Sequence, residues 1–303
     1  MPLYAFHNDH FRPLSEVSVA LDDAGFVWGA TVVDRCRTYG QLPFRLEDHL
    51  ERFAASCKLA HVALRSTPLE LREIAAELLL RNQSSIAGEV DAFLVFLATP
   101  GTLDQHSPTL VVYPELLNPA HYAPTVLKGA HLVTPKVRQP AQDSVPPRIK
   151  QRSRLHWWLA EHEAKQRAGD ANALLLDAEG CLTETAVANL VLVLNEVVCS
   201  PRRARILPGI SLKVLEELCA SAKLCYEERD LKNADVAVAS EAILTSTAYG
   251  LAPVRRIDER AFPTPGPVFT RLCAAWKKQL GFEPHAEFQR VEGEKQNPAT
   301  GAG

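Results

Sequence analysis

The chain has 303 residues, with 33 Lys and Arg against 36 Asp and Glu, which gives a formal net charge of −3 at pH 7. This balance excludes a polybasic surface of the kind that binds nucleic acid or an anionic membrane. Hydrophobic residues make up 47% and charged residues 23% of the chain, which is typical of a globular protein and not of a disordered one. No run reaches the roughly 18 apolar residues that span a bilayer, and no secretory leader is recognisable.

The seven cysteines indicate a reducing environment. They are odd in number, scattered along the chain and never paired as C-x-x-C. Neither a disulfide framework nor a zinc site is therefore predicted, and we expect a cytoplasmic protein without a bound metal.

The first elements in chain order are a strand, a turn and a strand, followed by a helix. Two apolar runs between residues 26 and 45 flank the turn Gly40-Gln41. From residue 47 to residue 60, apolar side chains recur at three- and four-residue steps, which predicts a helix with one buried face.

A second helix has a clear start signal. Thr67 is its expected N-cap, Pro68 its first residue, and Glu70 completes a T-x-x-E capping box. Strands are then expected at residues 92–98, 109–113 and 131–134. Together these elements predict an α+β domain over residues 1–134.

A proline-rich segment, residues 135–147, reads as a linker to a second domain over residues 148–289. The pattern beyond it predicts helices at residues 153–167, 209–223 and 268–280, and strands at 173–177, 190–194, 235–239 and 242–245. The polar residues 290–303 are expected to form a disordered tail.

Common nucleotide, hydrolase and zinc motifs are absent from the sequence. Two charged residues nevertheless occupy notable positions: Lys150 stands where the linker enters the second domain, and Glu184 directly precedes an apolar strand. Taken singly, each has an ordinary explanation, as an exposed lysine or as a charge at a strand edge.

Two further segments could bind an anion. In Ile206-Leu-Pro-Gly-Ile-Ser211, a glycine and a hydroxyl residue open a helix, whose first N–H groups lack intrahelical acceptors. In Leu244-Thr-Ser-Thr-Ala-Tyr249, several hydroxyl residues follow a strand, as they also do in a plain turn.

Taken in order with His49-Leu-Glu-Arg52-Phe53, these segments resemble the class IV aminotransferase family, the fold-type IV pyridoxal phosphate enzymes. That family includes branched-chain and D-amino acid aminotransferases and aminodeoxychorismate lyase. The resemblance runs from about Gly25 to Val254 and covers the motifs H-x-x-R-[LF], a lysine ahead of a long helix, G-x-[LV]-x-E-x-x-x-x-N-L, L-P-G-I-[ST] and T-x-T-A. It implies an α+β fold with an N-terminal α/β sandwich and a C-terminal pseudo-barrel with helices. It also implies a homodimer.

The resemblance assigns the cofactor residues. Lys150 would hold pyridoxal 5'-phosphate as an internal aldimine and then move the proton between substrate and cofactor. Glu184 would pair with the pyridine nitrogen. The phosphate would be bound by Arg52, the N–H groups of Ile210 and Ser211, the Ser211 hydroxyl and Thr247.

The expected substrate residues are Trp28, Arg37, Arg154 and Ala248. Trp28, Val33 and Arg37 fall where branched-chain enzymes tend to use Tyr, Phe and Arg, and Arg37 is suited to bind a carboxylate bidentately. An outward-facing strand charge is the alternative interpretation of Arg37. The R-x-H pair of D-amino acid aminotransferases is replaced here by Leu97-Ala-Thr-Pro-Gly101.

The function that this resemblance implies is transamination between an amino acid, with a branched-chain-like donor favoured, and a 2-oxo acid. The alternative is an aminodeoxychorismate lyase type of elimination that releases pyruvate, for which Arg154 is the motivating residue. A non-catalytic cofactor carrier or interaction protein on the same scaffold is a third hypothesis. Neither a nucleic acid nor a membrane is expected as a partner.

Overall fold

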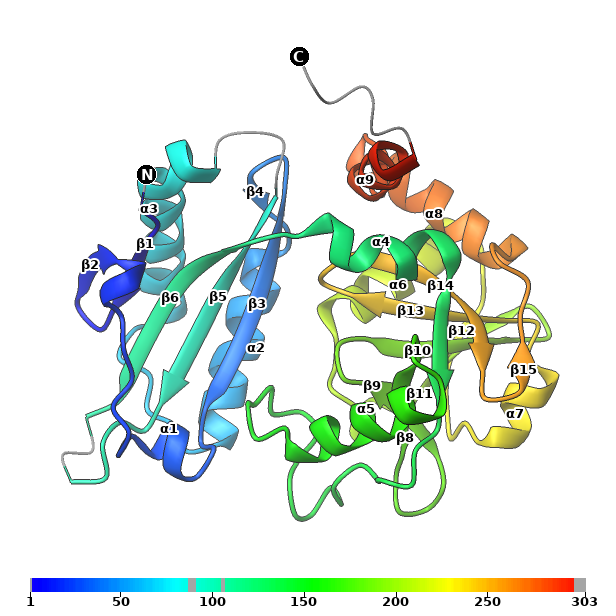
Figure 1. Cartoon of the computed structure of the whole chain (residues 1–303), viewed down its shortest axis with the longest axis horizontal. Helices are drawn as coiled ribbons and strands as arrows, with labels where there is room; N and C mark the ends of the chain where they lie inside the picture. The colour runs from blue at the N-terminus through cyan, green and yellow to red at the C-terminus, as the bar shows by residue number, and fades with distance from the viewer. Residues whose placement is uncertain (1, 87–90, 105–106, 297–303) are drawn as a thin grey trace. The chain divides into compact units, whose positions relative to one another are not determined.

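The computed structural model describes residues 2–86, 91–104 and 107–296. The chain divides into two compact units, the first made of Met1–Leu117 and Arg148–Arg154 and the second of Asn118–Pro147 and Leu155–Gly303 (Figure 1). None of the helices in these described ranges is long and apolar enough to cross a membrane.

The first unit is a six-stranded antiparallel sheet of order β2-β1-β6-β5-β3-β4, with two helices packed on it. Leu50 and Phe53 of one helix and Leu71 and Leu78 of the other share a core with the sheet. The elements are β1 (Tyr4–His7), β2 (His10–Pro13), η1 (Leu14–Glu16), α1 (Ala24–Val27), β3 (Val32–Tyr39), β4 (Leu42–Pro43), α2 (Leu46–Leu59), α3 (Pro68–Ile86), β5 (Ala92–Thr99) and β6 (Thr109–Leu116).

The capping box at the start of α3 is confirmed. The Glu70 N–H donates to Thr67 Oγ1 at 3.3 Å, and the Thr67 N–H donates to Glu70 Oε2 at 2.7 Å. The strand expected from residue 26 instead begins at Val32, because the Asp23 carboxylate accepts the Gly25 N–H at 2.7 Å and starts the short helix α1.

The second unit contains a closed ring of strands. β9 pairs with both β8 and β10, so the order β9-β10-β13-β14-β7-β8 closes on itself, while β11, β12 and β15 extend it. This confirms the pseudo-barrel with helices. The elements are α4 (Pro119–Lys128), β7 (Ala130–Val133), α5 (Leu155–Arg167), β8 (Asn172–Leu176), β9 (Leu182–Thr185), β10 (Asn189–Leu194), β11 (Val197–Pro201), η2 (Arg203–Arg205), α6 (Ile210–Ser221), β12 (Tyr226–Arg229), α7 (Asn233–Val238), β13 (Glu241–Ser246), β14 (Gly250–Ile257), β15 (Arg260–Ala261), α8 (Pro267–Leu280) and α9 (Ala286–Gln296).

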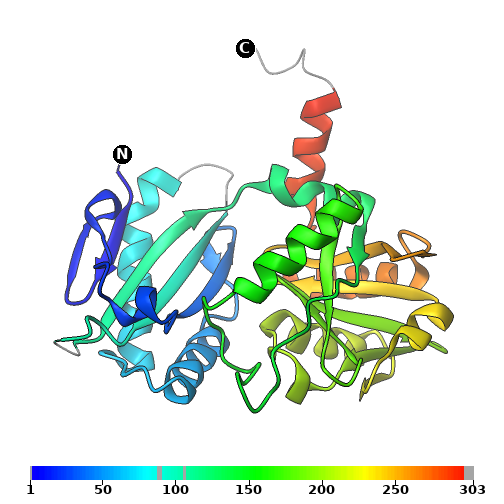
Figure 2. The ribbon, with the colours of Figure 1, turned by 60° about the horizontal axis from the view of Figure 1, so that its bottom comes forward.

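Three expectations about this unit were wrong. Residues 118–134 belong to it and not to the first unit, because β7 pairs with β14 and β8. Residues 233–238 form α7 where a strand was expected, since the Lys232 N–H and Asp235 Oδ2 cap a helix at 2.7 Å. Residues 290–296 are helical, because α9 buries Phe288 and packs against α4 (Figure 2). The remainder of the expected tail, residues 297–303, lies outside the described residues.

Candidate active site

Lys150 lies on a segment that is hydrogen-bonded to both β3 and α2. The Val33 N–H donates to the Lys150 carbonyl at 2.9 Å, and the Lys150 N–H donates to Ser56 Oγ at 3.2 Å. Two residues further on, the Arg152 N–H donates to the Thr31 carbonyl at 2.9 Å. These bonds explain why residues 148–154 belong to the first unit, although the linker separates them from it in sequence.

A buried ionic cluster joins Asp34 of β3 to His49 and Arg52 of α2. Arg52 binds Asp34 as a fork, with Nε to Oδ2 and Nη2 to Oδ1 both at 2.8 Å, and His49 Nδ1 lies 2.7 Å from Oδ1. Burial alone would raise the pKa of Asp34, but the Arg52 and His49 charges and hydrogen bonds outweigh it and hold that pKa well below its ordinary value. Arg52 is therefore held in place by a carboxylate that stays ionised.

The pKa of His49 is affected by burial and by the charges of both Arg52 and Lys150. Burial lowers the pKa of His49; Asp34 opposes this, and the charges of Arg52 and Lys150 add to the lowering. Sequence reasoning singled out Lys150, Arg52 and the motif histidine but missed Asp34. The available signal was the alternation of Val32, Asp34 and Cys36 along one strand. It places a carboxylate on the same face as two apolar side chains, and a buried carboxylate needs a partner.

In the second unit, Glu184 and Asn189 are directly opposite each other where β9 and β10 meet. Both side chains are buried, and Asn189 Nδ2 donates to Glu184 Oε2 at 2.9 Å. The other carboxylate oxygen, Oε1, accepts the Leu207 N–H at 3.0 Å. The carboxylate assigned to the ring nitrogen is thus fixed to the turn that leads into α6.

Helix α6 begins at Ile210. Its N-cap is Gly209, which has no side chain to accept a hydrogen bond from the first N–H groups of the helix. The Lys213 N–H donates to the Gly209 carbonyl at 3.1 Å, so the N–H groups of Ile210 and Ser211 precede the first intrahelical donor. A twelve-residue helix that presents unused N–H groups attracts an anion at this end.

The turn between β13 and β14 contains Thr247 and Ala248. Ser246 Oγ donates to the Val187 carbonyl at 2.8 Å and accepts the Ala248 N–H at 3.3 Å, which fixes the turn. Next to it, Thr245 Oγ1 is buried and has no hydrogen-bond partner in the described part of the chain. A buried hydroxyl of this kind needs a polar partner. Together with the first N–H groups of α6, it is a donor of the type that a cofactor phosphate group accepts from.

The expected substrate residues differ in exposure. Arg37 is buried, with Nη2 at 3.5 Å from Asp91 Oδ2 and Cζ at 4.2 Å from the Tyr39 ring centroid. This burial excludes the outward-facing strand charge that was its alternative interpretation. Trp28 is 73% exposed at the end of α1, Ala248 is buried, and Arg154 is half-buried.

Residues 31–257 match the family model for class IV amino-transferases. The chain belongs to the class IV aminotransferase family. It is 28% identical to branched-chain-amino-acid aminotransferase-like protein 2 of Arabidopsis thaliana over 91% of this chain, but it spans only about half of that protein's length. It is also 26% identical to D-alanine aminotransferase of Bacillus licheniformis, over 90% of this chain and 95% of that protein.

Solved structures share the fold. The branched-chain amino acid aminotransferase of Escherichia coli superposes with a TM-score of 0.84 at 21% identity, over 93% of this chain and 95% of that one. The branched-chain amino acid aminotransferase of the archaeon Thermoproteus uzoniensis, solved with norvaline, gives a TM-score of 0.83 at 22% identity, over 93% and 96% of the two chains.

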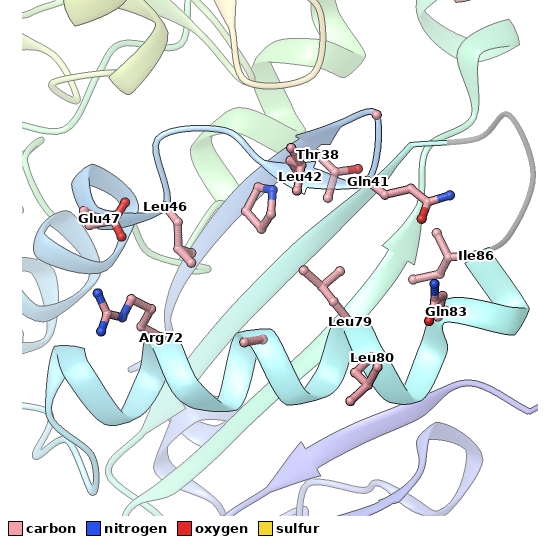
Figure 3. A pocket seen from close by; sticks show the side chains of 13 residues that line it. Thr38, Gln41, Leu42, Leu46, Glu47, Arg72, Leu79, Leu80, Gln83 and Ile86 are labelled. Carbon is pink, nitrogen blue, oxygen red and sulfur yellow. The ribbon is translucent and has the colours of Figure 1, made fainter.

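Two other features of the chain lie apart from the predicted residues. A groove of about 610 Å³ runs between the β3–β4 hairpin and α3; Leu42 and Leu79 line it, and Glu47 and Arg72 lie at one end (Figure 3). It contains none of the sequence-predicted site residues. In the second unit, the carboxylates of Asp177 and Glu179 bind Arg205 at 2.5 and 2.7 Å, so both acidic groups of that cluster already have a guanidinium as their partner.

Proposed function

We propose that the protein is a pyridoxal phosphate-dependent transaminase that moves an amino group between an amino acid and a 2-oxo acid, with a branched-chain-like donor favoured. The observation that carries the proposal is the placement of Glu184, a buried carboxylate hydrogen-bonded to the turn that opens α6. A carboxylate for a ring nitrogen and a helix start for a phosphate are the two anchors that this cofactor needs.

Each unit contributes residues of the kinds that bind this cofactor. In the second unit, Glu184 would pair with the ring nitrogen, and the N–H groups of Ile210 and Ser211, the Ser211 hydroxyl and Thr247 would bind the phosphate. In the first unit, Arg52 would add a charged contact to the phosphate, and Asp34 would hold its guanidinium in place.

Lys150 would carry the cofactor covalently and act as the acid and base. When bound, pyridoxal phosphate supplies an electron sink that stabilises negative charge at the substrate Cα. The Lys150 amine would move a proton between the substrate and the cofactor, taking it from Cα of the amino donor and delivering a proton to Cα of the 2-oxo acid in the second half of the exchange. The three hydrogen bonds that the backbone of residues 150–152 makes to Thr31, Val33 and Ser56 would hold in place the backbone from which this side chain extends.

Four residues would form the substrate site. Arg37 is the expected partner of the substrate carboxylate, and its ion pair with Asp91 would hold the guanidinium in one orientation. Trp28, Arg154 and Ala248 are the other proposed contacts. The family homodimer and its use of loops from the partner are part of the same proposal.

The first test is the visible spectrum of the protein with pyridoxal phosphate, recorded while amino donors are added one at a time. We expect the protein to hold the cofactor covalently and a branched-chain amino acid to convert the bound cofactor to its amino form. Lys150→Ala should abolish both the covalent attachment and the turnover, because it removes the side-chain amine that would form the covalent bond and move the proton. Lys58→Ala, which removes an exposed lysine of α2, is the matched control and should behave like the wild type.

Three results would contradict the proposal. Full transamination by Lys150→Ala would remove the lysine from the mechanism. Pyruvate release from aminodeoxychorismate without any amino acceptor would select the lyase. Bound cofactor that reacts with no amine would select a carrier.

A further inference from the structure

The side chain of Asn189 spans two elements of the cofactor-binding half of the second unit. Its Nδ2 donates one hydrogen to Glu184 Oε2 at 2.9 Å and the other to the Leu207 carbonyl at 3.0 Å. Leu207 in turn donates its N–H to Glu184 Oε1 at 3.0 Å. The carboxylate, the amide and the turn before α6 therefore form one closed set of hydrogen bonds.

A third contact fixes the amide from the side of α6. A Cβ added to Gly209 would lie 2.1 Å from Asn189 Oδ1, a distance that no real Cβ atom tolerates. The N-cap of α6 is therefore a glycine, because the Asn189 amide lies too close to the backbone there for any side chain. Backbone pairing holds the same residue on two further sides, opposite Glu184 on β9 and opposite Thr245 on β13.

The chemistry of this position requires an amide. Two donors on one planar nitrogen serve both the carboxylate and the backbone carbonyl, and aspartate offers neither donor. Leucine would fill a similar volume, but it would leave Glu184 Oε2 and the Leu207 carbonyl without this donor in a buried setting.

We propose that Asn189 is a positioning residue that holds the Glu184 carboxylate at a fixed place relative to the first N–H groups of α6. The inference rests on the proposed function, in which Glu184 pairs with the ring nitrogen and the start of α6 binds the phosphate. Asn189 would fix the distance between these two groups. Asn189 acts through Glu184 and the turn at Leu207 and does not itself touch the reacting atoms.

The test compares two ways of displacing the amide with one control. Asn189→Leu removes both donors, and Gly209→Ala pushes the amide away from the opposite side. The control, Asn82→Leu, removes another buried asparagine that donates to two backbone carbonyls, at 2.8 and 3.0 Å, in the first unit. The dissociation constant for pyridoxal 5'-phosphate is measured by absorbance. Independently, the pH titration of the Glu184 carboxyl is followed by carbon-13 NMR without cofactor, with Glu184→Gln assigning the resonance.

We expect both Asn189→Leu and Gly209→Ala to weaken cofactor binding, by roughly 10- to 100-fold for the loss of a hydrogen bond to a charged group. In both variants the Glu184 carboxyl should take up its proton at a higher pH than in the wild type, because the donor to its charged form is removed in Asn189→Leu and displaced in Gly209→Ala. Asn82→Leu should lower the melting temperature while leaving both readouts at their wild-type values.

The outcomes separate this inference from the proposed function. If the wild type binds no pyridoxal phosphate, the proposed function fails, and the Glu184 titration still decides whether Asn189 controls that carboxylate. If the wild type binds the cofactor but Asn189→Leu leaves both readouts unchanged, the inference alone is overturned. It is overturned as well if Asn82→Leu weakens cofactor binding equally, since the effect would then be general destabilisation.

Discussion

Asp34 shows how one side chain can hold a candidate site residue in place without belonging to a recognised motif. It lies at the centre of a cluster in which Arg52 binds both of its oxygens and His49 binds one. A buried guanidinium without a carboxylate partner is costly, because the charge is removed from water without compensation. The order of motifs predicted Arg52, but only the fold shows which acid holds it, since Asp34 is fifteen and eighteen residues away from its two partners.

We expect Asp34→Asn to destabilise the cofactor-free protein by about 3–5 kcal/mol at pH 7, the range for breaking a buried ion pair by removing one partner. The folded-state pKa of Asp34 lies below its unfolded value, so its stabilisation is complete above the unfolded pKa of about 4 and is lost as the pH falls through the folded pKa. The gap between wild type and variant should therefore narrow only below about pH 4. Urea denaturation as a function of pH measures it.

Glu115→Gln is the matched control for this prediction. Glu115 pairs with Arg35 of the same strand β3 at 2.6 Å, but both side chains are partly exposed. Its loss should cost at most about 1 kcal/mol. Equal losses in the two variants would show that burial of the Asp34 pair has no special consequence for stability.

At the scale of elements, prediction succeeded where the signal is local and failed where partners are distant. The capping box of Thr67 and Glu70 lies within four residues, so the start of α3 could be predicted from the sequence. The four residues of β7 carry no signal for their place in the barrel, because that place depends on pairing with β14 and β8. For the same reason, the membership of Lys150 in the first unit could not be predicted, because it depends on hydrogen bonds to residues distant in sequence.

The turn that carries Thr247 depends on packing between β14 and α8. Gly250, the first residue of β14, has φ +69°, and a Cβ there would lie 1.4 Å from Trp276 Cη2. Trp276 is buried and fills the space that a side chain at position 250 would need. The close approach of the indole ring therefore requires glycine.

We expect Gly250→Ala to destabilise the protein by roughly 2–5 kcal/mol, from a left-handed backbone term of about 1–2 kcal/mol and an overpacking term of about 1–3 kcal/mol. Gly180→Ala is the control, because Gly180 also has a positive φ, +76°, but nothing lies within 4 Å of the place that its Cβ would occupy. It should show the backbone term alone. Thermal denaturation of both variants, with Trp fluorescence as the probe, measures the difference. Equal melting temperatures would mean that the ring moves aside freely.

At the scale of the whole molecule, several large apolar side chains of the first unit are exposed within a short stretch of sequence. Phe26 and Trp28 are 69% and 73% exposed, with Leu21 and Val27 beside them in sequence. The segment is held rigidly, because buried Asp23 accepts hydrogen bonds from Thr99 at 2.8 Å and from Thr109 at 3.1 Å. A fixed, exposed aromatic surface is characteristic of a protein interface.

The proposed homodimer would give these exposed side chains a partner, a second copy of the chain. We expect sedimentation to give twice the 33.4 kDa chain mass. Phe26→Glu combined with Trp28→Glu should raise the dimer dissociation constant by at least roughly 100-fold, because charge would replace aromatic anchors at a desolvated interface. The control is Leu80→Glu, because Leu80 of α3 is exposed to a similar extent as Phe26 and Trp28; this variant should leave the mass unchanged. A wild-type monomer would refute the dimer. A dimer that resists the double variant but dissociates in Leu80→Glu would instead place the interface over the groove beside α3, because Leu80 lines that groove.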